Sequence, residues 1–128
     1  MTFDDVAHLC ANWPEVSVST SYSTPAPKAR SATFCRLWGE RDRAKADVGG
    51  ADVLVVFCDL DEKTFLLDES DGAVFSAPHY DGYGAVLVRL DLVTAPELRS
   101  LLIDSYLEKA PATLRRRLLD LEQSEITP

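Results

Sequence analysis

The chain has 128 residues, 46% of them hydrophobic and 27% charged, which is ordinary for one globular domain with its own core. Its formal net charge of −8 argues against a surface that binds a polyanion over its whole area, because phosphate groups are repelled on approach. No apolar run approaches the roughly 20 residues that cross a bilayer, and the acidic N-terminus lacks the apolar stretch of a signal peptide, so we expect a single cytoplasmic domain over residues 1–128 with no membrane partner.

The N-terminal third is predicted to hold a helix followed by extended chain. Apolar residues recur at helical spacing behind Thr2, a favourable N-cap, and Pro14 ends the helix. Residues 15–27 are rich in Ser, Thr and Pro and are expected to be extended or looped, with a short edge strand beginning near Val16. From residue 28 to residue 38 the apolar period becomes two, which predicts a strand. One face of that strand is predicted to carry Phe34, Arg36 and Trp38.

The rest of the chain alternates short strands with helices. Residues 52–58 form a continuous β-branched run, typical of a central strand, and Thr94 with Glu97 forms a capping box in front of a long helix. The other expected elements are a charged hairpin loop at 39–51, a short helix capped by Asp59 or Asp61, strands at 73–75 and 85–90, and a C-terminal helix and tail at 111–128. The predicted fold class is α+β, a single domain with an antiparallel sheet packed by helices in the order α-β-β-β-α-β-β-α-α.

The cysteines and the sequence motifs of this chain do not indicate a catalytic or metal-binding site. Cys10, Cys35 and Cys58 are widely spaced, without a C-x-x-C pair, and each lies at an apolar position, so we expect buried free thiols in a reducing compartment. No serine lies in a G-x-S-x-G turn, and no spacing of His, Cys and carboxylates suggests zinc. We therefore expect no catalytic residues, no metal and no cofactor, and the protein is not expected to be an enzyme.

Two motifs resemble those of a known family. They are Ser-Tyr-Ser-Thr-Pro-Ala at 21–26 and Pro-His-Tyr-Asp-Gly-Tyr at 78–83, supported by the strand at 86–91 and the capped helix at 94–109. From Thr2 to about Leu118 the chain resembles the MmcQ/YjbR-like family of small bacterial proteins. The resemblance implies the YjbR-like double-wing fold, which is secretion-chaperone-like, and it implies DNA binding through protruding hairpins.

The chain also departs from that family pattern. Pro27 replaces the usual aromatic residue, Ser31 replaces a glycine of the first hairpin turn, and Gly84-Ala85 replaces a proline-aromatic pair. The connection at 39–51 is longer and more charged than in the family. These changes affect the hairpin that would form a wing, so they bear on its role more than on the fold.

The first candidate site is a basic hairpin at residues 28–45, in a chain whose following part is acidic. Its candidate contacts to the DNA backbone are Lys28, Arg30, Arg36, Arg41, Arg43 and Lys45. Phe34 and Trp38 would stack on bases beside Arg36, with Tyr83 as a further stacking residue. Such binding would be weak and insensitive to base sequence, because phosphate contacts position without specifying. The alternative is that Phe34 and Trp38 pack beneath a helix and Arg36 lies at the sheet edge.

The second candidate site is the loop at 78–83. His79 carries an imidazole, and Tyr80 and Tyr83 carry hydroxyl donors, which suits a ligand cleft or a contact loop. The family resemblance places this loop beside Ser23 and Thr24, so a groove between 78–83 and 20–26 is expected. The alternative is a loop that buried tyrosines hold in place. The rival to DNA binding is therefore a protein-interaction or small-ligand-binding module that uses this groove, with a basic protein or a small ligand as partner.

Overall fold

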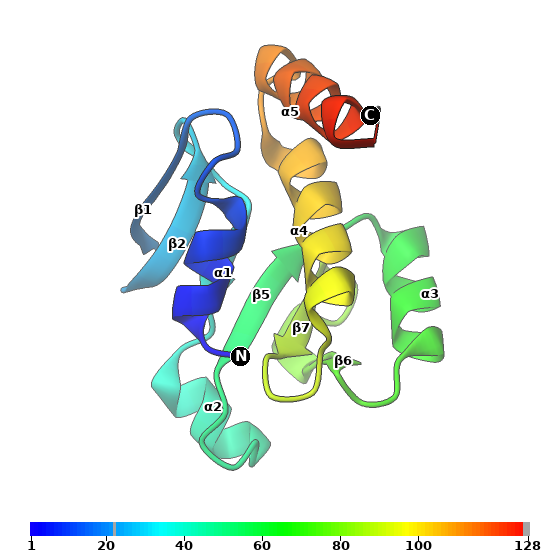
Figure 1. Ribbon diagram of the computed structural model, residues 1–128. Coiled ribbons are helices and arrows are strands. Elements are labelled where there is room, and N and C mark those ends of the chain that lie inside the picture. The colour runs from blue at the N-terminus through cyan, green and yellow to red at the C-terminus, as the bar shows by residue number, and fades with distance from the viewer. Residues whose placement is uncertain (22, 127–128) are drawn as a thin grey trace.

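The computed structural model describes residues 1–21 and 23–126, with side chains as far as Gln123. Within these residues the elements are α1 (Phe3–Cys10), β1 (Val16–Ser21), β2 (Thr24–Ala29), β3 (Ala32–Thr33), β4 (Cys35–Leu37), α2 (Glu40–Ala46), β5 (Val53–Phe57), α3 (Leu60–Glu69), β6 (Val74–Phe75), the 3-10 turn η1 (Pro78–Tyr80), β7 (Ala85–Arg89), α4 (Ala95–Lys109) and α5 (Ala112–Ile126). The predicted α+β class is confirmed, and Figure 1 shows the arrangement.

The strands form two antiparallel sheets rather than the one that was predicted. The first has the order β1-β2-β3, and the second has the order β4-β5-β7-β6. In the first sheet β1 and β2 make a long hairpin in which Val16 lies opposite Ala29 and Ser21 opposite Thr24. In the second sheet β5 lies between β4 and β7, so the β-branched run at 52–58 is the central strand that its sequence predicts.

The prediction of a charged hairpin loop at 39–51 is wrong, because α2 occupies Glu40–Ala46. The charges that suggested a loop suit a helix: Glu40 and Asp42 lie in the first turn, and Arg43 and Lys45 lie in the last, as the helix dipole favours. No residue of α2 is buried, so its sequence lacks the periodic apolar residues from which a helix is predicted.

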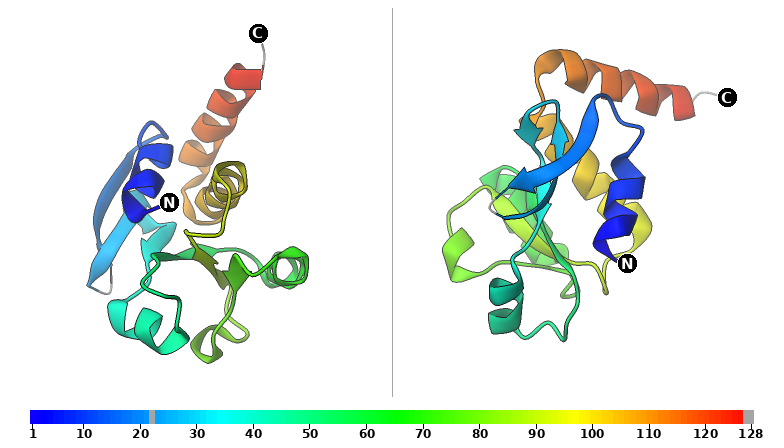
Figure 2. Two further views of the ribbon diagram at one scale, coloured as in Figure 1. Left: turned by 60° about the horizontal axis from the view of Figure 1, so that its bottom comes forward. Right: turned by 90° about the vertical axis from the view of Figure 1, so that its left-hand side faces the viewer.

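Helix α4 covers one face of the four-stranded sheet, whereas α2 and the loop that contains η1 lie on the other face (Figure 2, left). Both faces of β5 are buried: Leu54 and Val56 point to the α4 side, and Val53 and Val55 point to the α2 side. The larger apolar core lies on the α4 side and includes Val6, Phe34, Leu98, Leu102, Tyr106, Leu114 and Leu118. The smaller core on the α2 side holds Trp38, Val48, Tyr80 and Leu87 beside the two valines.

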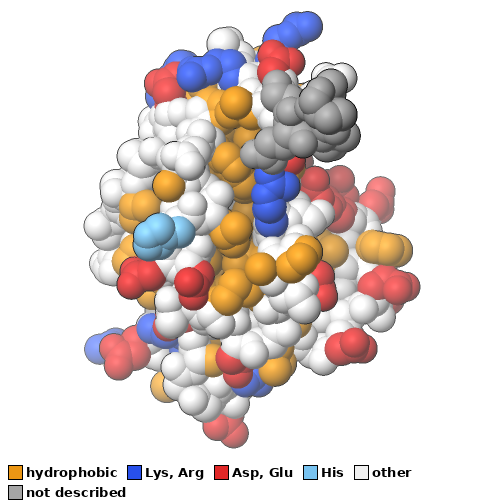
Figure 3. All heavy atoms as spheres, in the orientation of Figure 1, with side chains coloured by type: hydrophobic (Ala, Val, Ile, Leu, Met, Phe, Trp, Pro, Cys, Tyr) orange, Lys and Arg blue, Asp and Glu red, His pale blue; other side chains and the backbone are white. Residues whose placement is uncertain are grey.

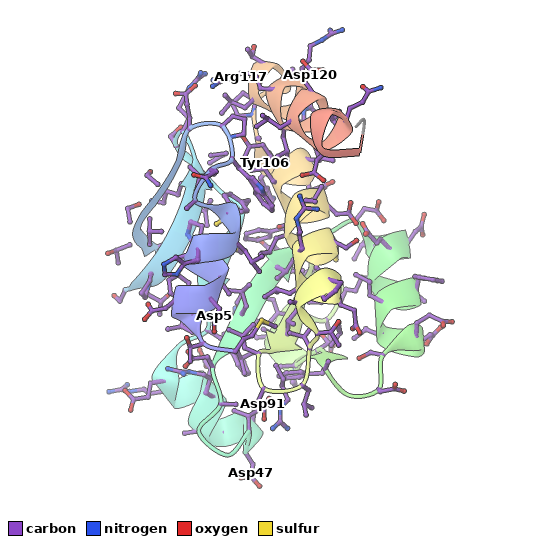
Figure 4. The ribbon with its side chains drawn as sticks, viewed as in Figure 1. Asp5, Asp47, Asp91, Tyr106, Arg117 and Asp120 are labelled. Carbon is purple, nitrogen blue, oxygen red and sulfur yellow. The ribbon has the colours of Figure 1, made fainter. Side chains whose placement is uncertain are left out.

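The predicted strand at 28–38 is interrupted at Phe34, which lies between β3 and β4. The Phe34 ring packs edge-on against Tyr106, with centroids 5.2 Å apart, in the larger core. Tyr106 belongs to α4 and its side chain points toward the first sheet (Figure 4); its hydroxyl donates to the Pro14 carbonyl at 2.7 Å. Trp38 lies instead in the smaller core. The prediction that Phe34, Arg36 and Trp38 share one face is therefore wrong, because the break reverses the alternation after Phe34.

The three thiols agree with the expectation from their sequence positions. Cys10, Cys35 and Cys58 are free and buried, as predicted. Among the described residues, no helix combines the length and the apolar character needed to cross a membrane.

Candidate functional site

An open hollow lies on the face of the four-stranded sheet that α4 does not cover. We call it the sheet-face cleft; its floor is formed by Arg36 and Trp38 of the β4 region and by Val55 and Phe57 of β5. One wall is α2 with Gly39 before it, and the other wall is the loop at 77–83. The cleft has two overlapping parts of about 450 and 600 Å³, within the range of small-molecule sites.

Arg36 and Tyr80 form the polar centre of the sheet-face cleft. Nη2 of Arg36 donates a hydrogen bond of 2.8 Å to the Tyr80 hydroxyl oxygen. The Tyr80 side chain is 4% exposed, and burial raises the pKa of its hydroxyl although nearby Arg36 lowers it. The phenol is therefore neutral at physiological pH and retains its hydrogen as a donor.

Aromatic rings continue from Tyr80 to the rim of the cleft. The His79 ring lies edge-on to Tyr80 with centroids 5.3 Å apart, and the Tyr83 ring is tilted at 6.0 Å. Tyr83 is 52% exposed, an unusual position for a large aromatic side chain. His79, Tyr80 and Tyr83 of the 78–83 loop all line this hollow, on the segment where the sequence predicted one wall of a groove.

Lys63 of α3 holds this loop in place, and the sequence analysis missed it. It is only 6% exposed, and its Nζ donates to the carbonyl oxygens of Tyr80 at 2.5 Å and of Tyr83 at 2.9 Å. A lysine between Glu62 and Thr64 on a short polar helix is expected to be exposed to solvent, so nothing in the sequence predicted that it would be buried. The side chain fixes the loop wall of the sheet-face cleft from behind.

The described residues of the 20–26 segment do not meet the 78–83 loop across the sheet-face cleft. Ser23 and Thr24 lie at the tip of the β1–β2 hairpin, where the Thr24 hydroxyl donates to the Ser21 carbonyl at 3.0 Å. Tyr22 of the same segment lies outside the described residues. Of the described residues at 20–26, none lines the sheet-face cleft; α2 takes their place as the opposite wall.

The six predicted DNA-contacting cations are dispersed over the fold rather than gathered on one hairpin. Arg30 pairs with Glu15 at 2.6 Å, and Arg43 pairs with Asp52 at 3.0 Å. The others are Lys28, which donates to the Thr20 carbonyl, Arg36 in the cleft, and Arg41 and Lys45, exposed on α2. On the face shown in Figure 3, Lys and Arg side chains form separate groups among acidic ones.

The predicted stacking residues of the hairpin are buried. Phe34 is 0% exposed and Trp38 is 5% exposed, with the Trp38 ring packed against Phe75 at 6.1 Å. Neither ring offers a face to a nucleic-acid base, so the prediction that Phe34 and Trp38 stack on DNA is wrong. The alternative was that both rings pack beneath a helix and Arg36 lies at the sheet edge. Both rings are buried, but in two separate cores, and Arg36 lies on the edge strand β4.

Comparison with known proteins supports the fold and identifies relatives. No family model matches the chain. The crystal structure of Deinococcus radiodurans protein DR2400, which carries a domain described as DUF419, superposes with a TM-score of 0.63 at 22% identity, covering 84% of this chain and 77% of that one. At this identity the similarity shows a common fold.

Closer in sequence are the uncharacterized proteins Rv2570 of Mycobacterium tuberculosis and Mb2600 of Mycobacterium bovis. Each is 35% identical over 129 residues, which covers 92% of this chain and 95% of the relative. The alignment therefore includes every element that builds the sheet-face cleft, within chains of nearly equal length. The chain belongs to the family of these mycobacterial proteins.

Proposed function

We propose that this protein is an MmcQ/YjbR-like protein that binds a small organic ligand in the sheet-face cleft. Membership in that wider group is supported by the motifs at 21–26 and 78–83 and by the fold shared with a DUF419 protein. The ligand-binding role is carried by one observation: the hydrogen-bonded pair of Arg36 and Tyr80 stands in a hollow whose floor is otherwise apolar. Few convergent polar groups on an apolar surface are typical of small-molecule sites.

We propose binding rather than catalysis, because the described residues that line the cleft include no serine, threonine or cysteine that could act as a nucleophile. Cys58, which follows the cleft residue Phe57 in the chain, is buried, and desolvation raises its pKa to about 11. A thiol of that pKa stays protonated and unreactive at neutral pH. The three buried free thiols also fit the reducing cytoplasm as the compartment of the protein.

DNA binding is the less favoured function. It requires a continuous basic surface to compensate a net charge of −8, and the cations that were predicted to supply it are divided among two sheets and a helix. Two of them, Arg30 and Arg43, already face carboxylates. A fluorescence titration with duplex DNA at low salt tests this directly, and binding tighter than that of an equally acidic control protein would restore the DNA hypothesis.

The proposed function is tested by NMR with a library of small fragments. Because the cleft is built from distinct segments, a true ligand shifts a recognisable set of signals together: the Trp38 indole N–H, the His79 ring and the amides of 80–83. The β1–β2 hairpin serves as an internal control, since its described residues do not line the cleft. A library whose hits move signals only outside the cleft would overturn the proposal, and hits for basic peptides alone would favour a protein partner.

A further inference from the structure

We infer that the ligand of the sheet-face cleft is a flat aromatic carboxylate whose anionic end is held jointly by the Arg36 guanidinium and the Tyr80 hydroxyl. This inference rests on the proposed small-ligand function and specifies its chemical class. It follows from three properties of the cleft: the direction of its hydrogen-bond donors, its local charge, and the shape and chemistry of its floor and rim.

The hydrogen-bond donors of the cleft favour a ligand that carries an oxygen anion. In the bond between Arg36 and Tyr80 the phenol oxygen is the acceptor, so the hydrogen of that hydroxyl points elsewhere. Among the described residues no acceptor receives this hydrogen. The guanidinium donates five N–H groups in a plane that matches a carboxylate, and it polarises the phenol that it bonds. An arginine and a phenol that line one hollow can both donate to an oxygen anion placed there.

The local charge agrees with an anionic ligand. Arg36 and Lys45 line the cleft, and Asp42 is the single carboxylate among the lining residues. A hollow with a positive balance is notable on a chain whose net charge is −8, because most of the surface repels anions. Behind the loop wall, Lys63 adds a further positive group 2.5 Å from the Tyr80 carbonyl.

The floor and the rim of the sheet-face cleft favour a ligand with a flat ring. Val55 and Phe57 present an apolar strip on β5 next to Arg36. His79 and Tyr83 stand at the rim with exposed ring surface, so a planar ligand that lies on the strip meets aromatic edges and faces on its sides. A ring with a carboxylate at one end therefore matches the cleft at both ends.

The test uses three probes of similar size: benzoate, benzamide and cyclohexanecarboxylate. Benzamide removes the charge and keeps the ring, whereas cyclohexanecarboxylate keeps the charge and removes the flat π-system. We expect benzoate to bind the intact protein with a dissociation constant of about 1 mM, as suits so few atoms. We expect each of the other two probes to bind at least about tenfold more weakly, a difference of about 1.4 kcal/mol.

Variants then assign the anion contact. Tyr80→Phe removes one hydroxyl and keeps the buried ring, and Arg36→Lys keeps the charge but removes the planar fork. We expect each to weaken benzoate binding about fivefold to tenfold and to leave benzamide binding unchanged. Arg41→Gln is the matched control, because Arg41 is an exposed cation of α2 outside the cleft lining, and it should leave both probes unaffected.

The outcomes separate this inference from the proposed function. If benzamide binds in the cleft as tightly as benzoate, or if the two variants weaken both probes equally, the carboxylate assignment is wrong while small-ligand binding stands. If cyclohexanecarboxylate equals benzoate, the aromatic requirement is wrong. If no small molecule of any charge shifts the signals of the cleft, the proposed function itself fails.

Discussion

Replacing Lys63 by methionine removes the two hydrogen bonds that hold the 78–83 loop and keeps the apolar stem of the side chain. A bond from an ammonium to a carbonyl contributes about 1.5 to 3 kcal/mol, and loss of a buried charge returns part of that through relieved desolvation. Both carbonyls retain a backbone partner, the Tyr80 oxygen from the Tyr83 N–H and the Tyr83 oxygen from the Ala85 N–H. We therefore expect a net loss of about 2 kcal/mol in the free energy of unfolding.

Urea denaturation measures this loss, and thermal unfolding should show a midpoint about 6 to 8 °C lower for a chain of this size. Hydrogen exchange should accelerate in residues 78–84 and stay unchanged in the described part of the β1–β2 hairpin, because both hydrogen bonds of the Lys63 ammonium go to the loop. Lys28→Met is the control: Lys28 makes one exposed bond of 3.3 Å, so we expect a change within about 0.5 kcal/mol. An unfolding free energy for Lys63→Met within 0.5 kcal/mol of the parent would refute the reasoning, as would uniform acceleration of exchange.

Two further substitutions test the core and the pH dependence. Ser105 is fully buried, accepts from the Phe57 N–H at 2.9 Å and donates to the Phe34 carbonyl, so Ser105→Ala should destabilise the protein by about 2 to 3 kcal/mol in urea, and a loss below 1 kcal/mol would show that other groups satisfy both atoms. Burial and the neighbouring Asp104 raise the pKa of the Glu62 carboxyl to about 7, so the folded state binds the proton more tightly than the unfolded state and loses stability as pH rises from 5 to 8. Glu62→Gln should thus match the parent near pH 5 and exceed it by about 1 kcal/mol at pH 8 after allowance for solvent screening; equal stability at both pH values would contradict this account.

Strong local signals predicted most of the elements. The β-branched run of β5 and the N-cap of α4 each depend on neighbouring residues alone, and both are present. The Thr94 hydroxyl accepts from the Glu97 N–H at 3.3 Å, which is one of the two hydrogen bonds of the predicted capping box. The helix α2 was missed because its sequence has no apolar face, and a helix without a buried face carries no periodic signal.

The reversal of alternation at Phe34 was missed for a different reason. Phe34 N–H donates to the Pro27 carbonyl, and its own carbonyl accepts from Ser105, which lies 71 residues further along the chain. A contact of that sequence separation leaves no local pattern. Because the direction of the Phe34 side chain depends on it, the division of Phe34 and Trp38 between two cores followed only from the assembled fold.

The candidate site was predicted only in part, because several of its contacts also join residues that are far apart in the sequence. The aromatic loop at 78–83 is recognisable from its composition, so its position beside a cleft could be predicted. Its partners were not: Arg36 reaches Tyr80 across 44 positions, and Lys63 reaches the loop across 17 and 20 positions. Cations grouped in the sequence were predicted to act together, yet the fold assigns them to different surfaces.

The walls of the sheet-face cleft and the main core belong to opposite faces of one sheet. Mutations in α2 or in the rim loop can therefore accumulate during evolution without weakening the packing around α4 that keeps the chain folded. Relatives that conserve the scaffold are free to diverge in what they recognise. Overall identity among such proteins is then a poor guide to a shared ligand, and for the proposed ligand site agreement at Arg36 and Tyr80 is the comparison that matters.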